Sequence, residues 1–170
     1  MKKKSFKKKG ILFWITGLSG VGKTSIANKI KHSIESKYGT TLVINGDDLR
    51  EIFKLKNYNQ SKRLEYGKMY CNFLKFLTDQ NINVIFTVVG MFSSLREWNR
   101  LNIQNYVEIF IKSEVKIIKK KTNKKTYRGS KKNIVGLGIS PQYPKKPDIL
   151  IENNFTKSIN YLSNQIIKKI

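Results

Sequence analysis

Nine consecutive residues near the start of the chain have the types and spacing of a phosphate-binding loop: Gly17, Leu18, Ser19, Gly20, Val21, Gly22, Lys23, Thr24 and Ser25. Two glycines are separated by four residues and are followed by Lys and Thr. Glycine lets the chain curl tightly, so that several backbone N–H groups point at one anion. Lys23 adds a mobile cation for the terminal phosphates, and the Thr24 hydroxyl is suited to hold Mg²⁺. The segment therefore predicts a site for ATP with Mg²⁺.

The residues on both sides of this segment decide between a phosphate-binding loop and a glycine-rich turn without a ligand. Residues 11–16 form an apolar run that is typical of a buried parallel strand. Ile26, Ala27, Ile30 and Ile34 recur at the spacing of one helix face. The positive end of that helix would point at the same anion. Because strand, glycine loop and helix follow in the order that the motif requires, we favour the phosphate-binding loop.

A carboxylate follows the second predicted strand, at residues 40–45. Ligands of open α/β sheets lie beyond the carboxyl ends of the strands, which is where Asp47 is expected. Asp47 is suited to accept a hydroxyl proton or to orient Mg²⁺. Alternatively, Asp47 or Asp48 caps the next helix. Position alone leaves both roles open.

Strands and helices alternate along the rest of the chain. We expect further strands at 82–89, 106–111 and 148–151, and helices at 61–80, 94–101, 114–120 and near the C-terminus. In the helix at 61–80, we expect a core face made of Leu64, Met69, Phe73, Leu74 and Leu77. The alternation predicts an α/β fold, a P-loop NTPase-type three-layer sandwich around a mostly parallel five-stranded sheet.

The expected organisation is a basic tail at residues 1–9 and a single domain at 10–170. Residues 119–132 are basic and contain few apolar side chains, so they cannot build a core. Near a phosphate loop, such a segment suggests a lid that closes over ATP, at about residues 119–141. An exposed surface loop without this role is the alternative.

Composition narrows the class of protein. The chain has 170 residues, enough for one domain, and no apolar run approaches the length of a membrane span. A single cysteine, Cys71, excludes an internal disulfide and fits a cytoplasmic enzyme. Three explanations fit the formal net charge of +23: a nucleic-acid partner, nucleotide ligands, or merely the composition that AT-rich coding DNA produces. Since no nucleic-acid-binding motif is recognisable, we expect no specific nucleic-acid partner, and a nucleic-acid-binding P-loop protein is the rival hypothesis.

Several motifs together resemble the adenylylsulfate kinase family. They are ITGLSGVGKT at residues 15–24, NGDDLR at 45–50, Tyr58 with Arg63 and Glu65, NIVG at 133–136 and PKKPD at 144–148. The resemblance implies an ATP-dependent kinase that phosphorylates the ribose 3′-hydroxyl of a nucleotide. It makes Asp47 the catalytic carboxylate, together with Lys23. It also implies that Arg50 and Arg63 hold the phosphate-side group of the acceptor, for which their planar donors are suited.

Departures from the family pattern lie in the acceptor pocket. Tyr66 stands where the family has Asn, and Gly90 with Met91 where it has Ser-Pro. Of the two Phe rings that clamp adenine in the family, Tyr58 replaces the first and Ile134 the second. These departures resemble a subgroup that includes cytidine diphosphoramidate kinases, which act in capsule biosynthesis.

We therefore expect cytidine diphosphoramidate as acceptor, narrowly ahead of adenylylsulfate. The expected acceptor-binding residues are Asp47, Arg50, Tyr58, Arg63, Lys132 and Ile134. The sequence leaves the oligomeric state open, and only analogy with the family suggests a homodimer.

Overall fold

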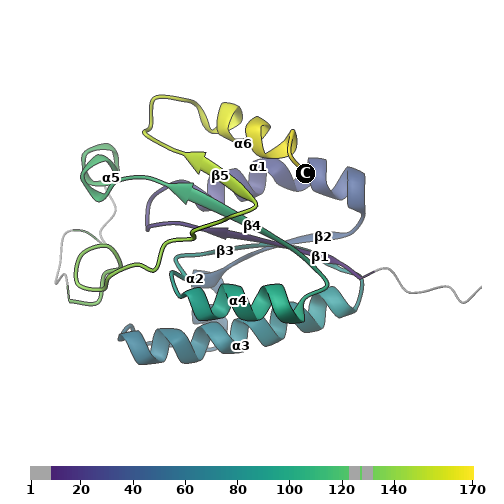
Figure 1. The fold of residues 1–170 in the computed structure, drawn as a ribbon, viewed down its shortest axis with the longest axis horizontal. Helices are drawn as coiled ribbons and strands as arrows, with labels where there is room; N and C mark the ends of the chain where they lie inside the picture. Colours follow the sequence, from purple (N-terminus) through teal and green to yellow (C-terminus); the bar gives the residue numbers. More distant parts are fainter. Residues whose placement is uncertain (1–8, 123–126, 128–131) are drawn as a thin grey trace, which may run out of the picture.

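A computed structural model describes residues 9–122, 127 and 132–170 of the chain. It contains one sheet of five strands between two layers of helices (Figure 1). The strands are β1 (Ile11–Thr16), β2 (Thr41–Asn45), β3 (Asn83–Val88), β4 (Asn105–Lys112) and β5 (Ile149–Glu152). Their order is β2-β3-β1-β4-β5, and every neighbouring pair is parallel. The predicted fold class is confirmed.

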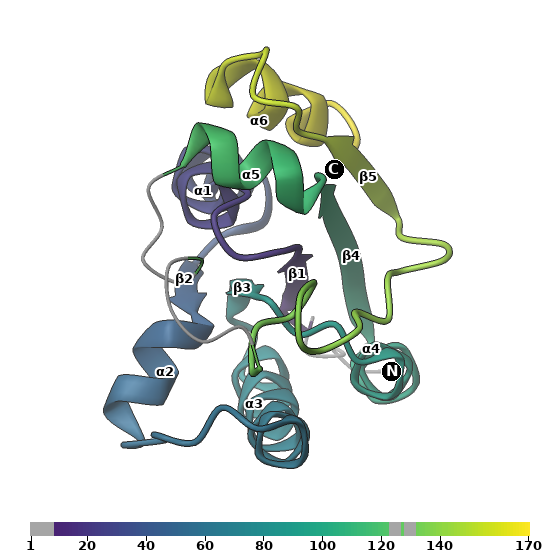
Figure 2. The same ribbon diagram turned by 90° about the vertical axis from the view of Figure 1, so that its left-hand side faces the viewer.

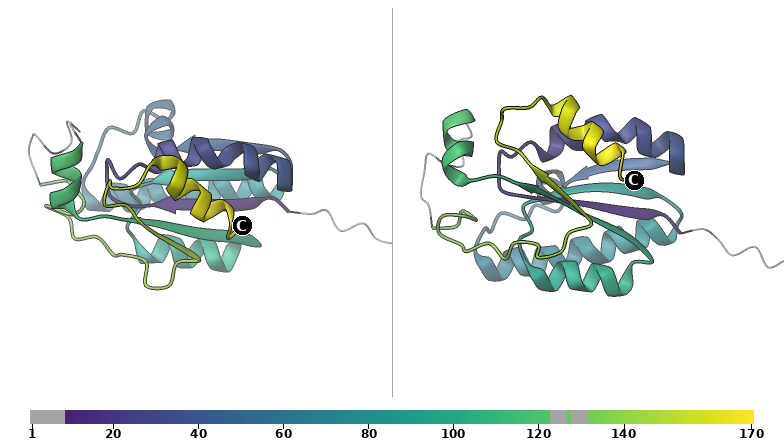
Figure 3. Two further views of the ribbon diagram at one scale, coloured as in Figure 1. Left: turned by 90° about the horizontal axis from the view of Figure 1, so that it is seen from above. Right: turned by 45° about the horizontal axis from the view of Figure 1, so that its top comes forward.

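Helices cover both faces of the sheet. On one face lie α1 (Lys23–Tyr38) and α6 (Ile159–Ile167), which are neighbours in the views of Figures 1 and 3. On the other lie α3 (Gln60–Asp79) and α4 (Ser93–Asn102). Two short helices follow strands: α2 (Gly46–Ile52) after β2, and α5 (Val115–Lys121) after β4. Predicted and observed ends agree within one or two residues, but 119–121, placed in the lid, belong to α5.

The central strand β1 joins the two cores. Phe13 and Ile15 pack in the core beneath α1 and α6, whereas Leu12 and Trp14 pack in the core beneath α3 and α4. Successive side chains of a strand point to opposite faces, so a strand buried on both faces must be apolar throughout. This arrangement explains the continuous apolar run before the glycine loop.

The buried face of α3 differs from the prediction. Its buried residues are Tyr66, Gly67, Tyr70, Cys71, Leu74 and Thr78. The prediction for Met69 was wrong, since its side chain is 42% exposed. Leu74 is buried as predicted, and Leu64, Phe73 and Leu77 are partly buried against the same core. Tyr66, Gly67 and Tyr70 also belong to the buried face, where Gly67 allows α3 to approach Leu95 of α4 closely.

We expect Gly67→Ala to destabilise the fold. A methyl group at this position would overlap Cδ1 of Leu95, which is itself buried. Overpacking of this kind costs about 1–3 kcal/mol, and the better helix propensity of Ala offsets part of it. Urea unfolding should therefore show a net loss of about 1–2 kcal/mol. Lys68→Ala, at the adjacent exposed position, is the control and should change little. An unchanged midpoint for Gly67→Ala would contradict this packing argument.

The carboxyl ends of the strands meet at one edge of the sheet, which faces the viewer in Figure 2. At this edge lie the glycine loop after β1, helix α2 after β2 and the segment after β3. In the described part of the chain, no helix is long and apolar enough to cross a membrane. The parallel topology thus gathers the predicted site residues in one place.

Candidate active site

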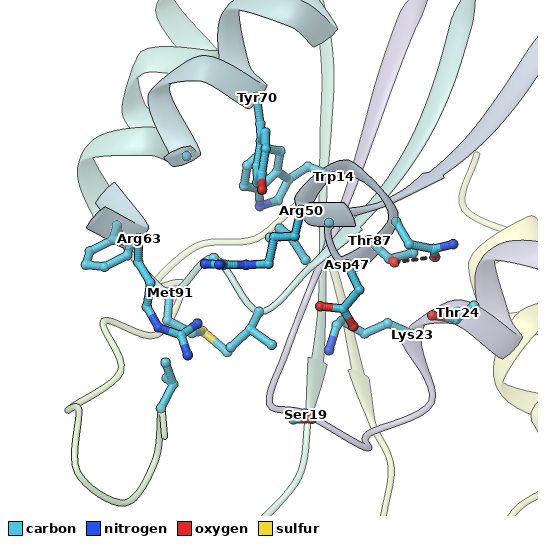
Figure 4. A pocket seen from close by; sticks show the side chains of 18 of the residues that line it. Trp14, Ser19, Lys23, Thr24, Asp47, Arg50, Arg63, Tyr70, Thr87 and Met91 are labelled. Atoms are coloured by element: carbon cyan, nitrogen blue, oxygen red, sulfur yellow. Dashed lines mark hydrogen bonds between the residues drawn. The ribbon is translucent and has the colours of Figure 1, made fainter. Parts of the chain in front are cut away.

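A cavity of about 280 Å³ opens at this edge (Figure 4). It is lined by the glycine loop, the start of α2, the first half of α3 and the segment 87–92. Ten predicted site residues line it: Ser19, Gly20, Gly22, Lys23, Thr24, Ser25, Asp47, Arg50, Tyr58 and Arg63. Five do not: Gly17, Leu18, Val21, Lys132 and Ile134.

The glycine loop is shaped for an anion. Gly20 and Gly22 have φ angles of 81° and 93°, in the left-handed region that glycine adopts without strain. Leu18 and Val21 are buried and anchor the loop in the core, which is why they do not face the cavity. The first turn of α1 holds no acidic side chain, so its positive end remains available to an anion.

Lys23 is the first residue of α1. Its ammonium group donates hydrogen bonds to the carbonyl oxygens of Gly17, at 3.0 Å, and of Leu18, at 2.9 Å. These bonds hold the side chain along the loop, inside the cavity. A long flexible stem lets the ammonium group exchange these carbonyl oxygens for phosphate oxygens.

Tyr127, in the middle of the predicted lid, contacts the glycine loop. The hydroxyl group of Tyr127 donates a hydrogen bond of 2.8 Å to the carbonyl oxygen of Ser19 in the glycine loop. Within the predicted lid, residues 123–126 and 128–131 lie outside the described residues. The lid therefore stays a prediction.

Asp47 lies in the first turn of α2, exposed, with its carboxylate directed toward Lys23 in Figure 4. The N-cap position of α2 belongs to Asn45, not to Asp47. Asn45 accepts a 2.7 Å hydrogen bond from the Thr87 hydroxyl and donates one of 2.7 Å to the Asp48 carboxylate. The neighbours of Asp47 are thus engaged in local structure, while Asp47 itself lines the cavity.

Two arginines lie beyond Asp47. Arg50 donates hydrogen bonds of 3.1 Å to the carbonyl oxygens of Leu55 and Asn57, and its guanidinium lies 4.2 Å from the centre of the Tyr58 ring. Arg63 donates to the carbonyl oxygen of Tyr58 at 2.8 Å and to that of Asn133 at 2.9 Å. The pair is therefore held in place by the backbone around it.

The two guanidinium groups also act on each other. Burial, and next the positive charge of Arg50, lower the pKa of Arg63 from its ordinary value. An anion placed between two like charges relieves their repulsion, and guanidinium donors match phosphate oxygens well. This part of the cavity is thus suited to a phosphate-type group.

Ile134 and Lys132 do not take the places predicted for them in this structure. Ile134 is only 8% exposed, and its neighbour Val135 lines the cavity instead. Lys132 is exposed and lies outside the cavity lining. Their contacts with an acceptor remain predictions, whereas Tyr58 lines the cavity as expected.

Trp14 and Tyr70 also line the cavity, and sequence reasoning missed both. Each sits at a core position of its element, where an aromatic side chain is ordinary. Burial raises the pKa of Tyr70, so its hydroxyl group stays protonated at neutral pH. No local pattern marks them, because only the packing of α3 on β1 brings them to the cavity.

The residues present fit a magnesium ion bound together with phosphates. The described part of the chain contains no cluster of three or more His, Cys, Asp or Glu side chains that could bind a metal by themselves. Mg²⁺ at nucleotide sites keeps several waters and needs only one or two protein oxygens besides the phosphates. Thr24 and Asp47 line the same cavity and offer such oxygens.

A glycine loop and lysine at the end of the central strand, on a parallel sheet of this strand order, define a P-loop nucleotide-binding protein. Comparison with known proteins narrows this class. The model of the adenylylsulphate kinase family matches residues 9–152, so the chain belongs to this family and is a kinase.

Two relatives illustrate the range of the family. The chain is 31% identical to the cytidine diphosphoramidate kinase of Campylobacter jejuni, over 94% of this chain and 95% of that protein. It is 26% identical to a probable adenylyl-sulfate kinase of Archaeoglobus fulgidus, over 84% of this chain and 96% of that one. The predicted resemblance to the family is confirmed.

Among solved structures, the APS kinase of Mycobacterium tuberculosis in complex with AMPPNP and APS has a similar fold. The TM-score is 0.81, at 21% identity, over 95% of this chain and 97% of that chain. At this level of identity, the likeness supports the fold.

Proposed function

We propose that this kinase transfers the terminal phosphoryl group of ATP to the ribose 3′-hydroxyl of a nucleotide that carries a charged 5′ arm. The observation that carries the proposal is the order of groups in one cavity. Lys23 and the glycine loop come first, then Asp47, then Arg50 and Arg63. A donor triphosphate, a hydroxyl and an anionic arm would need these groups in this order.

Each group has a distinct task in this reaction. The loop amides and Lys23 bind the phosphates of ATP and neutralise charge that develops during transfer. Asp47 accepts or orients the proton of the 3′-hydroxyl. Arg50 and Arg63 hold the 5′ arm, which fixes the distance between the hydroxyl and the transferred phosphoryl group. Tyr127, bonded to the Ser19 carbonyl oxygen of the glycine loop, would help to keep water from hydrolysing ATP.

A magnesium ion, held by Thr24 and by the phosphates, would supply further charge neutralisation when bound. We expect the kinase to require Mg²⁺ for this reason. A cytoplasmic location, where ATP is available, and a homodimer complete the proposal.

The proposed acceptor is cytidine diphosphoramidate, and adenylylsulfate is the alternative. Both combine a ribose with a two-centre anionic arm, so the groups that perform the transfer can serve either one. Two observations support cytidine. One is the similarity to the cytidine diphosphoramidate kinase of Campylobacter jejuni, and the other is the loss of one aromatic ring from the base-binding region. Only one aromatic ring, Tyr58, stands where the family clamps adenine between two, and stacking contributes about 1–3 kcal/mol per base.

An acceptor panel tests this proposal directly. With ATP and Mg²⁺, we expect a higher kcat/KM for cytidine diphosphoramidate than for adenylylsulfate, since a pyrimidine has less face to stack. Coupled measurement of ADP release, with the product located by ³¹P NMR, checks both the preference and the position of the new phosphate. A preference for adenylylsulfate would contradict the acceptor assignment, and phosphorylation elsewhere than the 3′-oxygen would contradict the reaction.

The rival hypothesis is a nucleic-acid binder with a structural nucleotide site, motivated by the net charge of +23. RNA binding that persists at physiological salt, without turnover of any acceptor, would favour it. Membership of a kinase family argues against it.

A further inference from the structure

Two polar groups at the inner end of the cavity have no hydrogen-bond partner among the described residues. They are the indole nitrogen Nε1 of Trp14 and the hydroxyl oxygen of Tyr70. Trp14 is 0% exposed and Tyr70 only 4%, and both line the cavity. Buried polar groups nearly always have partners, because leaving one unsatisfied costs free energy. A pair of them in one cavity therefore points to a ligand that supplies the partner atoms.

The two groups are held rigidly. Phe86 of β3 packs against both rings, with its centre 5.1 Å from that of Trp14 and 5.8 Å from that of Tyr70. Their orientation is thus set by the core and not by the ligand. A preorganised pair of this kind costs little entropy when a ligand binds.

Gly90 lies against the edge of the Trp14 ring and carries no side chain. A Cβ atom at position 90 would lie 3.1 Å from Cζ2 of Trp14, which is one atom removed from Nε1. It would also lie 2.9 Å from Cγ1 of Val88, so a larger residue could not be added without a shift. The close packing against the Trp14 ring edge therefore requires a glycine at this position, which is one of the departures noted in the sequence.

The position of the pair relative to Arg50 indicates which part of a ligand it meets. Viewed from Lys23, Trp14 and Tyr70 lie beyond Arg50 (Figure 4). Arg50 lines the cavity, and its guanidinium is held over the ring of Tyr66, 5.3 Å from the ring centre. Hydrogen-bond donors beside a fixed cation are suited to the oxygens of an anionic group.

We propose that Trp14 Nε1 and the Tyr70 hydroxyl form a subsite for the terminal group of the acceptor's 5′ arm. This inference rests on the proposed function, since it assumes a nucleotide acceptor with such an arm. The indole N–H donates to an oxygen of the terminal phosphoryl-type group. The Tyr70 hydroxyl donates to a second oxygen, or accepts from an amide nitrogen where the terminal group carries one. The subsite thereby selects acceptors whose arm extends beyond its first phosphate.

Tyr70→Phe tests the subsite, because it removes one oxygen and preserves the ring. The measured quantity is the ratio of kcat/KM for cytidine diphosphoramidate to kcat/KM for CMP, whose arm ends at the first phosphate. Loss of a buried hydrogen bond to the ligand should lower this ratio about 10- to 100-fold. Thermal stability should not fall, since the hydroxyl has no partner among the described residues to lose.

Tyr106→Phe is the matched control. Its hydroxyl oxygen is also buried, but it lies outside the cavity, so the ratio should stay at the wild-type value. An unchanged ratio in Tyr70→Phe would overturn the proposal, and so would an equal loss for both acceptors. An equal loss would place the hydroxyl against the base or ribose, or give it a purely structural role.

NMR can monitor the Trp14 indole group without a mutation. The chain has two tryptophans, and Trp98 lies outside the cavity, so ¹⁵N–¹H spectra should show two indole signals. With Mg²⁺ and a non-hydrolysable ATP analogue, cytidine diphosphoramidate should shift the Trp14 signal and CMP should not. The Trp98 signal should stay in place with both. A Trp14 signal that responds identically to both nucleotides would contradict the subsite.

Failure of the proposed acceptor is distinguishable from failure of the subsite. If the wild-type enzyme turns over adenylylsulfate and no cytidine nucleotide, the acceptor assignment fails. The same comparison is then made between adenylylsulfate and AMP. A Tyr70→Phe loss confined to adenylylsulfate would uphold the subsite, and no such loss would overturn it.

Discussion

Replacement of Lys23 by Ala is expected to lower kcat/KM for ATP by about 10³-fold or more, the scale of losing a key charge-stabilising group. Lys23 is the first residue of α1, and its ammonium group lies along the glycine loop, bonded to two loop carbonyls. In the proposed reaction it follows the phosphoryl group during transfer. No other lysine lines the cavity in the described part of the chain, so none can take its place.

The fold of the Lys23→Ala variant should remain intact, because a side chain facing a cavity contributes little to the core. Far-UV circular dichroism and thermal unfolding check this point. Lys29→Ala, on an exposed position of the same helix, is the control for the loss of one positive charge and should keep wild-type turnover. Near-normal turnover by Lys23→Ala would show that the P-loop kinase mechanism does not apply.

The parts of the site that the sequence predicts are those encoded locally. A glycine loop needs only its own residues and the strand and helix beside it, so Lys23 could be placed without knowledge of the fold. Placing Asp47 in the site required one further step of reasoning. The carboxyl ends of parallel strands meet at one edge, and a residue just after β2 must therefore lie near the loop after β1.

The parts that sequence reasoning missed depend on contacts between distant segments. Trp14 and Tyr70 occupy ordinary core positions, and their access to the cavity depends on how closely α3 approaches β1 and α4. Gly67, which permits that approach, carries no hydrophobic signal of its own. The same contact explains the error at Met69, since an aliphatic pattern cannot reveal that Tyr66, Gly67 and Tyr70 belong to the buried face.

Ile134 shows a different limit of prediction from sequence. Its assignment rested on alignment with a family motif, and such an alignment fixes the position in the chain but not the direction of the side chain. Here the turn that follows is closed by hydrogen bonds from the backbone N–H groups of Leu137, Gly138 and Ile139 to the carbonyl oxygen of Ile134. In this structure the Ile134 side chain is buried, and Val135 lines the cavity instead.

Replacement of Asp47 by Asn is expected to lower kcat by about 10²-fold or more, the contribution of a well-placed general base. The substitution keeps the shape of the side chain and its capacity for hydrogen bonds, and removes the negative charge. The KM for ATP should change much less, because the loop and Lys23 bind the phosphates. Steady-state kinetics with the best acceptor of the panel would separate the two parameters.

Asp48→Asn is a matched control for this variant. Asp48 lies in the same turn of α2, is exposed and carries the same charge, but its carboxylate bonds to Asn45 and does not line the cavity. Both changes weaken the favourable interaction of an acidic side chain with the helix N-terminus, by about 0.3–1 kcal/mol each. Both variants should therefore lose a similar, small amount of stability, and only Asp47→Asn should lose turnover. Loss of stability in Asp47→Asn with normal kcat would instead assign Asp47 to the helix terminus and leave the general base to another group.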